Sequence, residues 1–204
     1  MDRILICLAC AVLIFGQATA WPDDSAATAY SPIAVDMDAE IAKAKSAISV
    51  FAASLQAELK AAMQAGGPVR AISVCSTTAI PITQSVAAEQ GLQLSRVSLK
   101  NRNPANLPNE WQRDVLEFFE RRKAAGEQAT ALTWSDVREV DGLPQFRFMK
   151  AIPTTSLCLQ CHGKSLAPEI SARLEELYPE DKARGFEQGD IRGAFVVTRL
   201  VTEH

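Results

Sequence analysis

The chain has 204 residues, with 21 lysines and arginines against 24 aspartates and glutamates, which gives a net charge of −3 at pH 7. Basic and acidic residues are interspersed and form no basic stripe, so we expect no nucleic-acid partner. The length suits one domain with a hydrophobic core of its own.

Residues 1–20 have the pattern of a secretory signal peptide. Arg3 supplies a charged start, residues 4–15 form an apolar run, and Ala18-Thr19-Ala20 is a small-x-small cleavage site. The run is too short for a membrane span, and no later stretch reaches the ~20 apolar residues that a span needs. We therefore expect export to the periplasm, with no membrane span left after cleavage.

Residues 21–35 are small, polar and proline-bearing, and we expect them to form a flexible leader before a single domain over 36–204. Apolar side chains in 36–65 recur at helical spacing and form one stripe. Gly66-Gly67-Pro68 is a typical end for such a helix. Packing in a core is the simplest role for the stripe.

A second helix is predicted from about 69 to 90, closed by Gly91. Pro81 lacks a backbone N–H, so the turn over 74–79 is expected to be distorted. Together the two helices form an amino-terminal pair. The helix over 36–65 is apolar enough to pack on the domain or on a second copy, which leaves a homodimer open.

The later elements predict an α+β fold with an antiparallel sheet. Asp141-Gly142 is the strongest short-range hairpin signal in the chain. The order argues against an all-helical cytochrome c. The predicted elements are a strand over 92–99, a loop over 100–109, a helix over 110–125, strands over 131–140 and 143–152, a helix over 168–177, a polar connection over 178–189 and a strand over 191–201.

The most informative segment is Cys158-Leu159-Gln160-Cys161-His162, the attachment pattern of a c-type haem. In this pattern each thiol adds to a vinyl group of the porphyrin, and the adjacent histidine supplies an axial nitrogen to the iron. The predicted export supports this interpretation, because bacterial haem c is attached outside the cytoplasm in the c-type cytochromes that the motif resembles. We expect one covalent haem c.

Two other roles for the two cysteines remain open. A Cys-x-x-Cys pair can form a redox disulfide, and it can be half of a zinc site. Zinc is poorly supported, because the chain has no second Cys-x-x-Cys and no His-x-x-x-His to complete four ligands. A disulfide oxidoreductase would lack the usual βαβ setting and would leave His162 unexplained.

The ligand on the other face of the iron decides between electron transfer and gas or substrate binding. His204 is terminal, and Met37, Met63 and Met149 are candidates by residue type alone. Cys75 is the only cysteine after the signal peptide and outside the motif. It is either a small buried hydrophobe or a thiolate ligand that the metal keeps deprotonated.

Four segments resemble a family of single-haem c-type domains with a PAS-like fold, found as exported proteins and as ectodomains of signalling kinases. The resemblance covers roughly residues 36–201. It implies a PAS-like sheet with flanking helices, a haem thioether-linked to Cys158 and Cys161, and His162 with Cys75 as the axial pair. The matching segments are Val74-Cys75 and residues 98–106, 158–163 and 189–194.

A thiolate ligand stabilises ferric iron, so the resemblance implies a low potential. Reduction would weaken the bond to Cys75, and its departure would open a site for CO or NO. Lys100 and Arg102, with Asn101, lie in a loop that could reach the haem propionates, or that only makes solvated turns. Arg192 could act likewise. Trp111 and Phe148 are candidates for the haem wall or for the core.

We therefore predict an exported, cytochrome-like monohaem protein for redox sensing or low-potential electron transfer with an unidentified partner protein. Three alternatives remain. A gas sensor would signal through a partner chain, and a thiol oxidoreductase would use the two motif cysteines without haem. An enzyme such as a peroxidase is not expected, because it needs a vacant distal face and an acid–base residue, for which no well-placed histidine is available.

Overall fold

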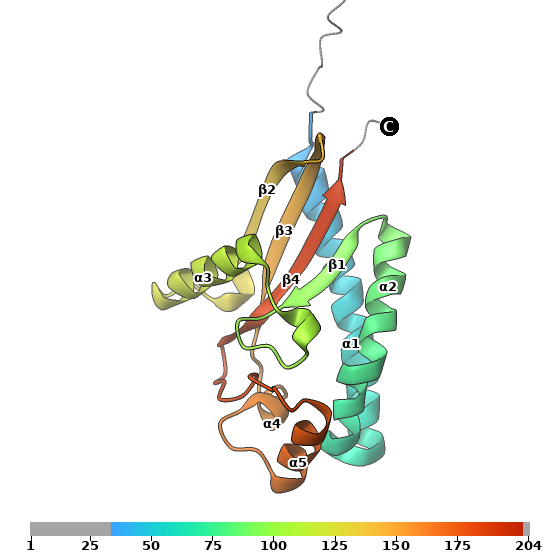
Figure 1. Ribbon diagram of the computed structural model, residues 1–204, viewed down its shortest axis with the longest axis vertical. Helices are drawn as coiled ribbons and strands as arrows, with labels where there is room; N and C mark the ends of the chain where they lie inside the picture. Colours follow the sequence, from blue (N-terminus) through green and yellow to red (C-terminus); the bar gives the residue numbers. More distant parts are fainter. Residues whose placement is uncertain (1–33, 202–204) are drawn as a thin grey trace, which may run out of the picture. The chain divides into compact units, whose positions relative to one another are not determined.

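The computed structural model describes residues 34–201, apart from the side chain of Cys75, and its centre is a four-stranded antiparallel sheet (Figure 1). The strand order is β1-β4-β3-β2, and all three pairings are antiparallel. The α+β class with a PAS-like sheet is thereby confirmed. The signal peptide, nearly all of the leader and His204 lie outside the described residues. The strands are β1 Gln93–Val97, β2 Thr133–Val140, β3 Leu143–Pro153 and β4 Ile191–Leu200.

Apart from the single turn over Leu159–His162, for which no helix was predicted, the helices follow the predicted order. They are α1 Met37–Ser73, α2 Ala79–Gln90, α3 Glu110–Ala124, α4 Leu159–His162 and α5 Pro168–Leu177, with a π-helical segment η1 over Val74–Thr78 and short 3-10 turns at Pro104–Asn106 and Ala129–Ala131. None of the described helices alone is long and apolar enough to cross a membrane; α1 with Ser76–Gln90 meets that test only as a pair bent by 63°.

The turn residues lie where the sequence predicts them. The backbone leaves helical geometry at Gly66 and at Gly67, whose φ is +68°, so α1 contains a break at the expected Gly-Gly-Pro. Gly91, with φ +60°, ends α2 in the left-handed conformation that glycine adopts without strain. Asp141 and Gly142 both have positive φ and join β2 to β3 in a two-residue hairpin.

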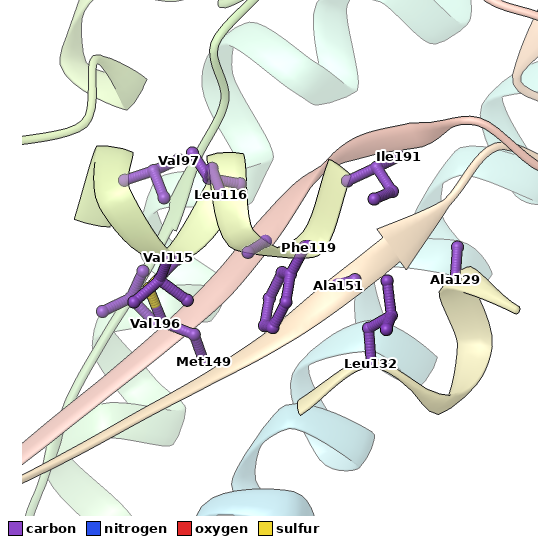
Figure 2. Close-up of a cluster of buried hydrophobic side chains, with 11 residues drawn as sticks. Val97, Val115, Leu116, Phe119, Ala129, Leu132, Met149, Ala151, Ile191 and Val196 are labelled. Carbon is purple, nitrogen blue, oxygen red and sulfur yellow. The ribbon is translucent and has the colours of Figure 1, made fainter. Parts of the chain in front are cut away.

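The sheet buries an apolar layer on each face. The first half of α1 packs Ile48 and Phe51 against Phe146, Phe148 and neighbouring residues on one face, with α2 beside it. On the opposite face α3 packs against the sheet (Figure 2). The residues of this second cluster are Val97, Val115, Leu116, Phe119, Ala129, Leu132, Met149, Ala151, Ile191, Ala194 and Val196.

The distortion predicted before Pro81 is present as the π segment η1. The N–H of Ala79 donates to the carbonyl of Val74, five residues earlier, in place of the α-helical spacing. The Ser73 carbonyl accepts from the hydroxyls of Ser76 at 2.9 Å and Thr77 at 2.8 Å. Two side-chain hydroxyls therefore add hydrogen bonds to the backbone at the start of the irregular turn.

Candidate functional site

One helical turn brings the three motif residues together. α4 begins directly after Cys158, whose carbonyl accepts the N–H of Cys161 at 3.2 Å and of His162 at 2.9 Å. Residues three and four positions apart share a face of a helix. Cys158, Cys161 and His162 accordingly all line the same cavity.

This cavity has a volume of about 340 Å³, within the range of small-molecule and cofactor pockets. Apolar side chains form much of its wall, and they come from α1, β1, β3 and the segment that leads from β3 into α4. They are Leu55, Leu59, Met63, Ala71, Ile72, Val97, Ile152 and Leu157. The second half of the predicted apolar stripe therefore lines a cavity, where the sequence predicted only core packing.

A small apolar cluster fixes the motif turn against α1. Ile72, only 2 % exposed, packs with Ile170 and Leu174 of α5 and with Tyr178, and Cys161 lies against this cluster. In Figure 1 the lower part of α1 extends past the sheet and lies beside α4 and α5, which it contacts. The cavity thus lies between α1, the motif turn and the segment over residues 96–106.

The imidazole of His162 is held in one tautomer. Its Nδ1–H donates to the carbonyl of Ala183 at 2.8 Å, which leaves the lone pair on Nε2. Burial lowers the pKa of His162 to about 2, with the positive charges of Arg192 and Arg102 acting in the same direction. The Ala183 hydrogen bond and Asp181 oppose this shift. The ring is therefore neutral at physiological pH and able to ligate a metal.

Arg102 lines the cavity, but its guanidinium is engaged beside the motif turn. Nε donates to Asp181 at 3.0 Å, and the two side chains are 7 % and 2 % exposed. Nη2 donates to the carbonyl of Cys161 at 2.5 Å and to that of Ala183 at 3.3 Å. These contacts differ from the expected reach toward propionates, which stays a prediction for Arg102.

The Asp181 carboxylate is the acceptor at the centre of this cluster. It also receives the Ala183 N–H at 2.9 Å and Nε of Arg184 at 3.0 Å. Burial raises its pKa, but the hydrogen bonds from Arg102, Ala183 and Arg184 outweigh burial, so the net shift is downward. Residues 178–189 were predicted from the sequence only as a polar connection, and no local pattern indicated that Asp181 would be a central acceptor.

The cations around the cavity differ from those the loop sequence suggested. Lys100 is not among the residues that line it; its Nζ lies 5.2 Å from the Phe186 ring centre, and it borders a separate cavity of about 320 Å³ with Glu120 and Asp190. The basic residues at the wall besides Arg102 are Lys60, Arg96 and Arg192. Only Arg192 was a sequence candidate.

Of the remaining candidates, one lies near the cavity in the chain and the others pack in or against the cores of the sheet. The backbone of Cys75 belongs to η1, one turn after the cavity-lining residues Ala71 and Ile72. Met149 and Phe148 are buried in the two sheet cores, so packing explains both. Trp111 stacks on Trp134 at 5.8 Å between ring centres and does not line the cavity.

The donor set and the cavity fit a covalently attached porphyrin. Two thiols and a neutral imidazole face an apolar space, and the buried Oδ1 of Asn101 at its wall has no hydrogen-bond partner among the described residues. Within residues 34–201 no group of three or more His, Cys, Asp or Glu side chains is placed to hold a metal ion by itself. A site that needs iron supplied within an organic ring matches these residues better than a bare metal site.

Comparisons with known proteins agree with the fold. The model of the Tll0287-like family matches residues 28–199. Among solved structures, the cyanobacterial heme-protein Tll0287 is similar, with 23 % identity and a TM-score of 0.59 over 81 % of this chain and 98 % of that chain. At this identity the likeness shows a common fold. No curated protein matches the chain significantly.

Proposed function

The chain belongs to the Tll0287-like family, and from this and from the cavity we propose that it is an exported monohaem c-type protein for redox sensing or low-potential electron transfer. The observation that carries the proposal is the single helical turn that places Cys158, Cys161 and His162 at the wall of one apolar cavity. Tll0287, the protein of similar structure, is a heme-protein, which supports the same group.

Each motif residue has a separate task in this proposal. Cys158 and Cys161 form the two thioether links, and His162 offers Nε2 because Nδ1 is bound to Ala183. When bound, haem supplies a one-electron redox couple. The apolar side chains of α1 exclude water from this space, and a lower dielectric strengthens the effect of nearby charges on that couple.

The cations at the wall provide partners for the two carboxylates of a haem. Lys60, Arg96 and Arg192 line the cavity, whereas Lys100 does not. Arginine binds carboxylates with two parallel hydrogen bonds, and lysine acts as a point charge. We assign the carboxylate-binding role to these three residues ahead of Lys100 and Arg102.

Cys75 is the proposed second axial ligand. The π-helical segment that carries its backbone supports this role, because π-bulges inside helices frequently occur at functional sites. A thiolate favours ferric iron and so lowers the potential, which suits a redox sensor or a low-potential carrier better than a catalyst. The physiological partner in either case is another redox protein.

Mass spectrometry of protein matured in an export-competent host with haem c assembly tests the proposal directly. The expected result is a polypeptide without residues 1–20 and with the mass of one haem added. Replacing Cys158 and Cys161 together with serine should remove that mass, whereas replacing the exposed Lys45 with serine should not. A wild-type mass without haem would refute the proposal and favour the thiol oxidoreductase.

A gas-sensing role is the second candidate, and the irregular η1 segment favours it. Loss of α-helical spacing there leaves a segment that can rearrange when Cys75 leaves a ligand position. Absorption spectra of the reduced protein with and without CO distinguish the two roles. A CO-dependent change supports gas binding, and identical spectra support electron transfer through a closed site.

A further inference from the structure

Arg102 and Asp181 form a buried ion pair at the edge of the motif turn. Both side chains are almost completely removed from solvent, at 7 % and 2 % exposure. A pair this deep is screened little by salt, and loss of one partner leaves an uncompensated buried charge. The two charges of such a pair act on the backbone and side chains that lie beside it.

What lies next to it is the backbone that holds His162. The same nitrogen of Arg102, Nη2, donates to the carbonyls of Cys161 and Ala183, at 2.5 and 3.3 Å. The Ala183 carbonyl is also the acceptor for Nδ1–H of His162. Asp181 binds the Ala183 N–H from the other side, at 2.9 Å. One ion pair therefore fixes both the residue before the imidazole and the carbonyl that orients it.

We propose that Arg102 and Asp181 are positioning residues that lock the His162 ring and set the charge that a metal on His162 experiences. The part of this proposal that concerns a metal rests on the proposed haem. Partners of a ligating histidine fix its tautomer and tune its basicity. Here Arg102 holds the Ala183 carbonyl in place and adds a positive charge, and Asp181 offsets that charge.

Opposite shifts of the midpoint potential are the signature of this role. Arg102→Gln removes a positive charge and favours ferric iron, so the potential falls. Asp181→Asn removes a negative charge with little change of shape, so the potential rises. We expect a change on the order of tenfold in the ferric-to-ferrous ratio, which is about 59 mV for one electron. A purely structural role would move both variants in the same direction.

Two further variants separate charge from position. Arg102→Lys keeps the charge, so the midpoint potential should stay close to wild type. It lacks the guanidinium fork that reaches Asp181 and the carbonyls together. Arg184→Gln is the matched control, because Arg184 pairs with the same Asp181 at 3.0 Å but no hydrogen bond from it to either carbonyl is found in the described residues. If Arg102→Gln does not accumulate, the other two variants decide. A midpoint potential that rises in Asp181→Asn but not in Arg184→Gln supports the proposal, and equal shifts of the potential in these two variants overturn it.

Nuclear magnetic resonance of the His162 Nδ1–H tests the positioning without haem. Wild-type protein and Arg184→Gln should show a slowly exchanging Nδ1 proton, and Arg102→Gln and Arg102→Lys should lose it. If wild-type protein carries no haem, the proposed function fails while this measurement still decides the role of Arg102. An Nδ1 proton that is equally protected in Arg102→Gln would overturn the positioning.

Discussion

Gly163 closes the motif turn, and replacing it with alanine should open that turn. Its φ of −72° is accessible to any residue, so space is the only obstacle. A Cβ there would lie 2.6 Å from the carbonyl oxygen of Leu159, the same oxygen that accepts the Gly163 N–H at 2.9 Å. The clash cannot be relieved without weakening this hydrogen bond.

The expected cost follows from those two contacts. Overpacking of this kind costs about 1–3 kcal/mol and a lost hydrogen bond about 1 kcal/mol, so Gly163→Ala should destabilise the protein by about 2–4 kcal/mol. In a chain of this size each kcal/mol lowers the melting temperature by roughly 2–4 °C. The displaced turn should also reduce the fraction of protein that carries haem, because α4 no longer presents Cys158 and Cys161 together.

Denaturant unfolding and the haem-to-protein absorbance ratio measure the two effects. Gly91→Ala is the control: it has open space around the added Cβ but a φ of +60°, so it should cost about 1–2 kcal/mol and leave haem attachment unchanged. A Gly163→Ala protein within about 0.5 kcal/mol of wild type, or one with full haem attachment, would show that the turn tolerates the extra atom and that this reasoning is wrong.

Three further predictions concern residues in the site and close to it in the chain or the fold. Ile72→Ala should cost about 2–5 kcal/mol and lower haem attachment, because Ile72 joins α1 to α5, whereas Ile72→Val should cost about 0.5–1.5 kcal/mol; equal unfolding midpoints for the two would contradict this. The lowered pKa of Asp181 contributes stability that is present above its ordinary pKa of 3.8 and is lost as pH falls through the folded value. Asp181→Asn should therefore flatten the decline in the free energy of unfolding below pH ~4, measured by urea unfolding. An unchanged slope would assign that decline to other carboxylates. Cys75→Ala should convert a six-coordinate ferric spectrum into a five-coordinate one, measured by absorption and electron paramagnetic resonance; an unchanged spectrum would place the ligand elsewhere.

Local sequence patterns were sufficient for the elements and for the motif. Gly91 and the Asp141-Gly142 pair mark chain reversals that only a few residues adopt, so the helix end and the hairpin could be placed from sequence. The haem motif is equally local, because the spacing of Cys158, Cys161 and His162 already puts them on one helical face.

Contacts between distant segments could not be read in the same way. Arg102 and Asp181 are 79 residues apart, and each alone looks like an ordinary loop charge. Lys60 and Arg96 reach the cavity from a helix and a strand whose relative placement depends on the whole fold. Periodicity showed that one face of α1 is apolar, but it did not show that Leu59 and Met63 face a cavity.

α1 has one part that packs in the core and another that lines the cavity, because the helix pair is longer than the sheet it covers. Ile48 and Phe51 lie over the strands and are buried there, while Leu55, Leu59 and Met63 lie farther along the same stripe. The break at Gly66-Gly67 turns the chain back, and Ala71 then joins the cluster of Leu59 and Met63.

This extension of α1 carries the site beyond most of the core. Val97 and Leu55 belong both to the apolar layers on the sheet and to the cavity wall, whereas the other described residues of those layers do not line the cavity. A group attached to α4 would add contacts with α1 and so join the motif turn to the helix pair. Because η1 begins two residues after Ile72, we expect a change of ligand at the cavity to act first on the geometry of this helical segment.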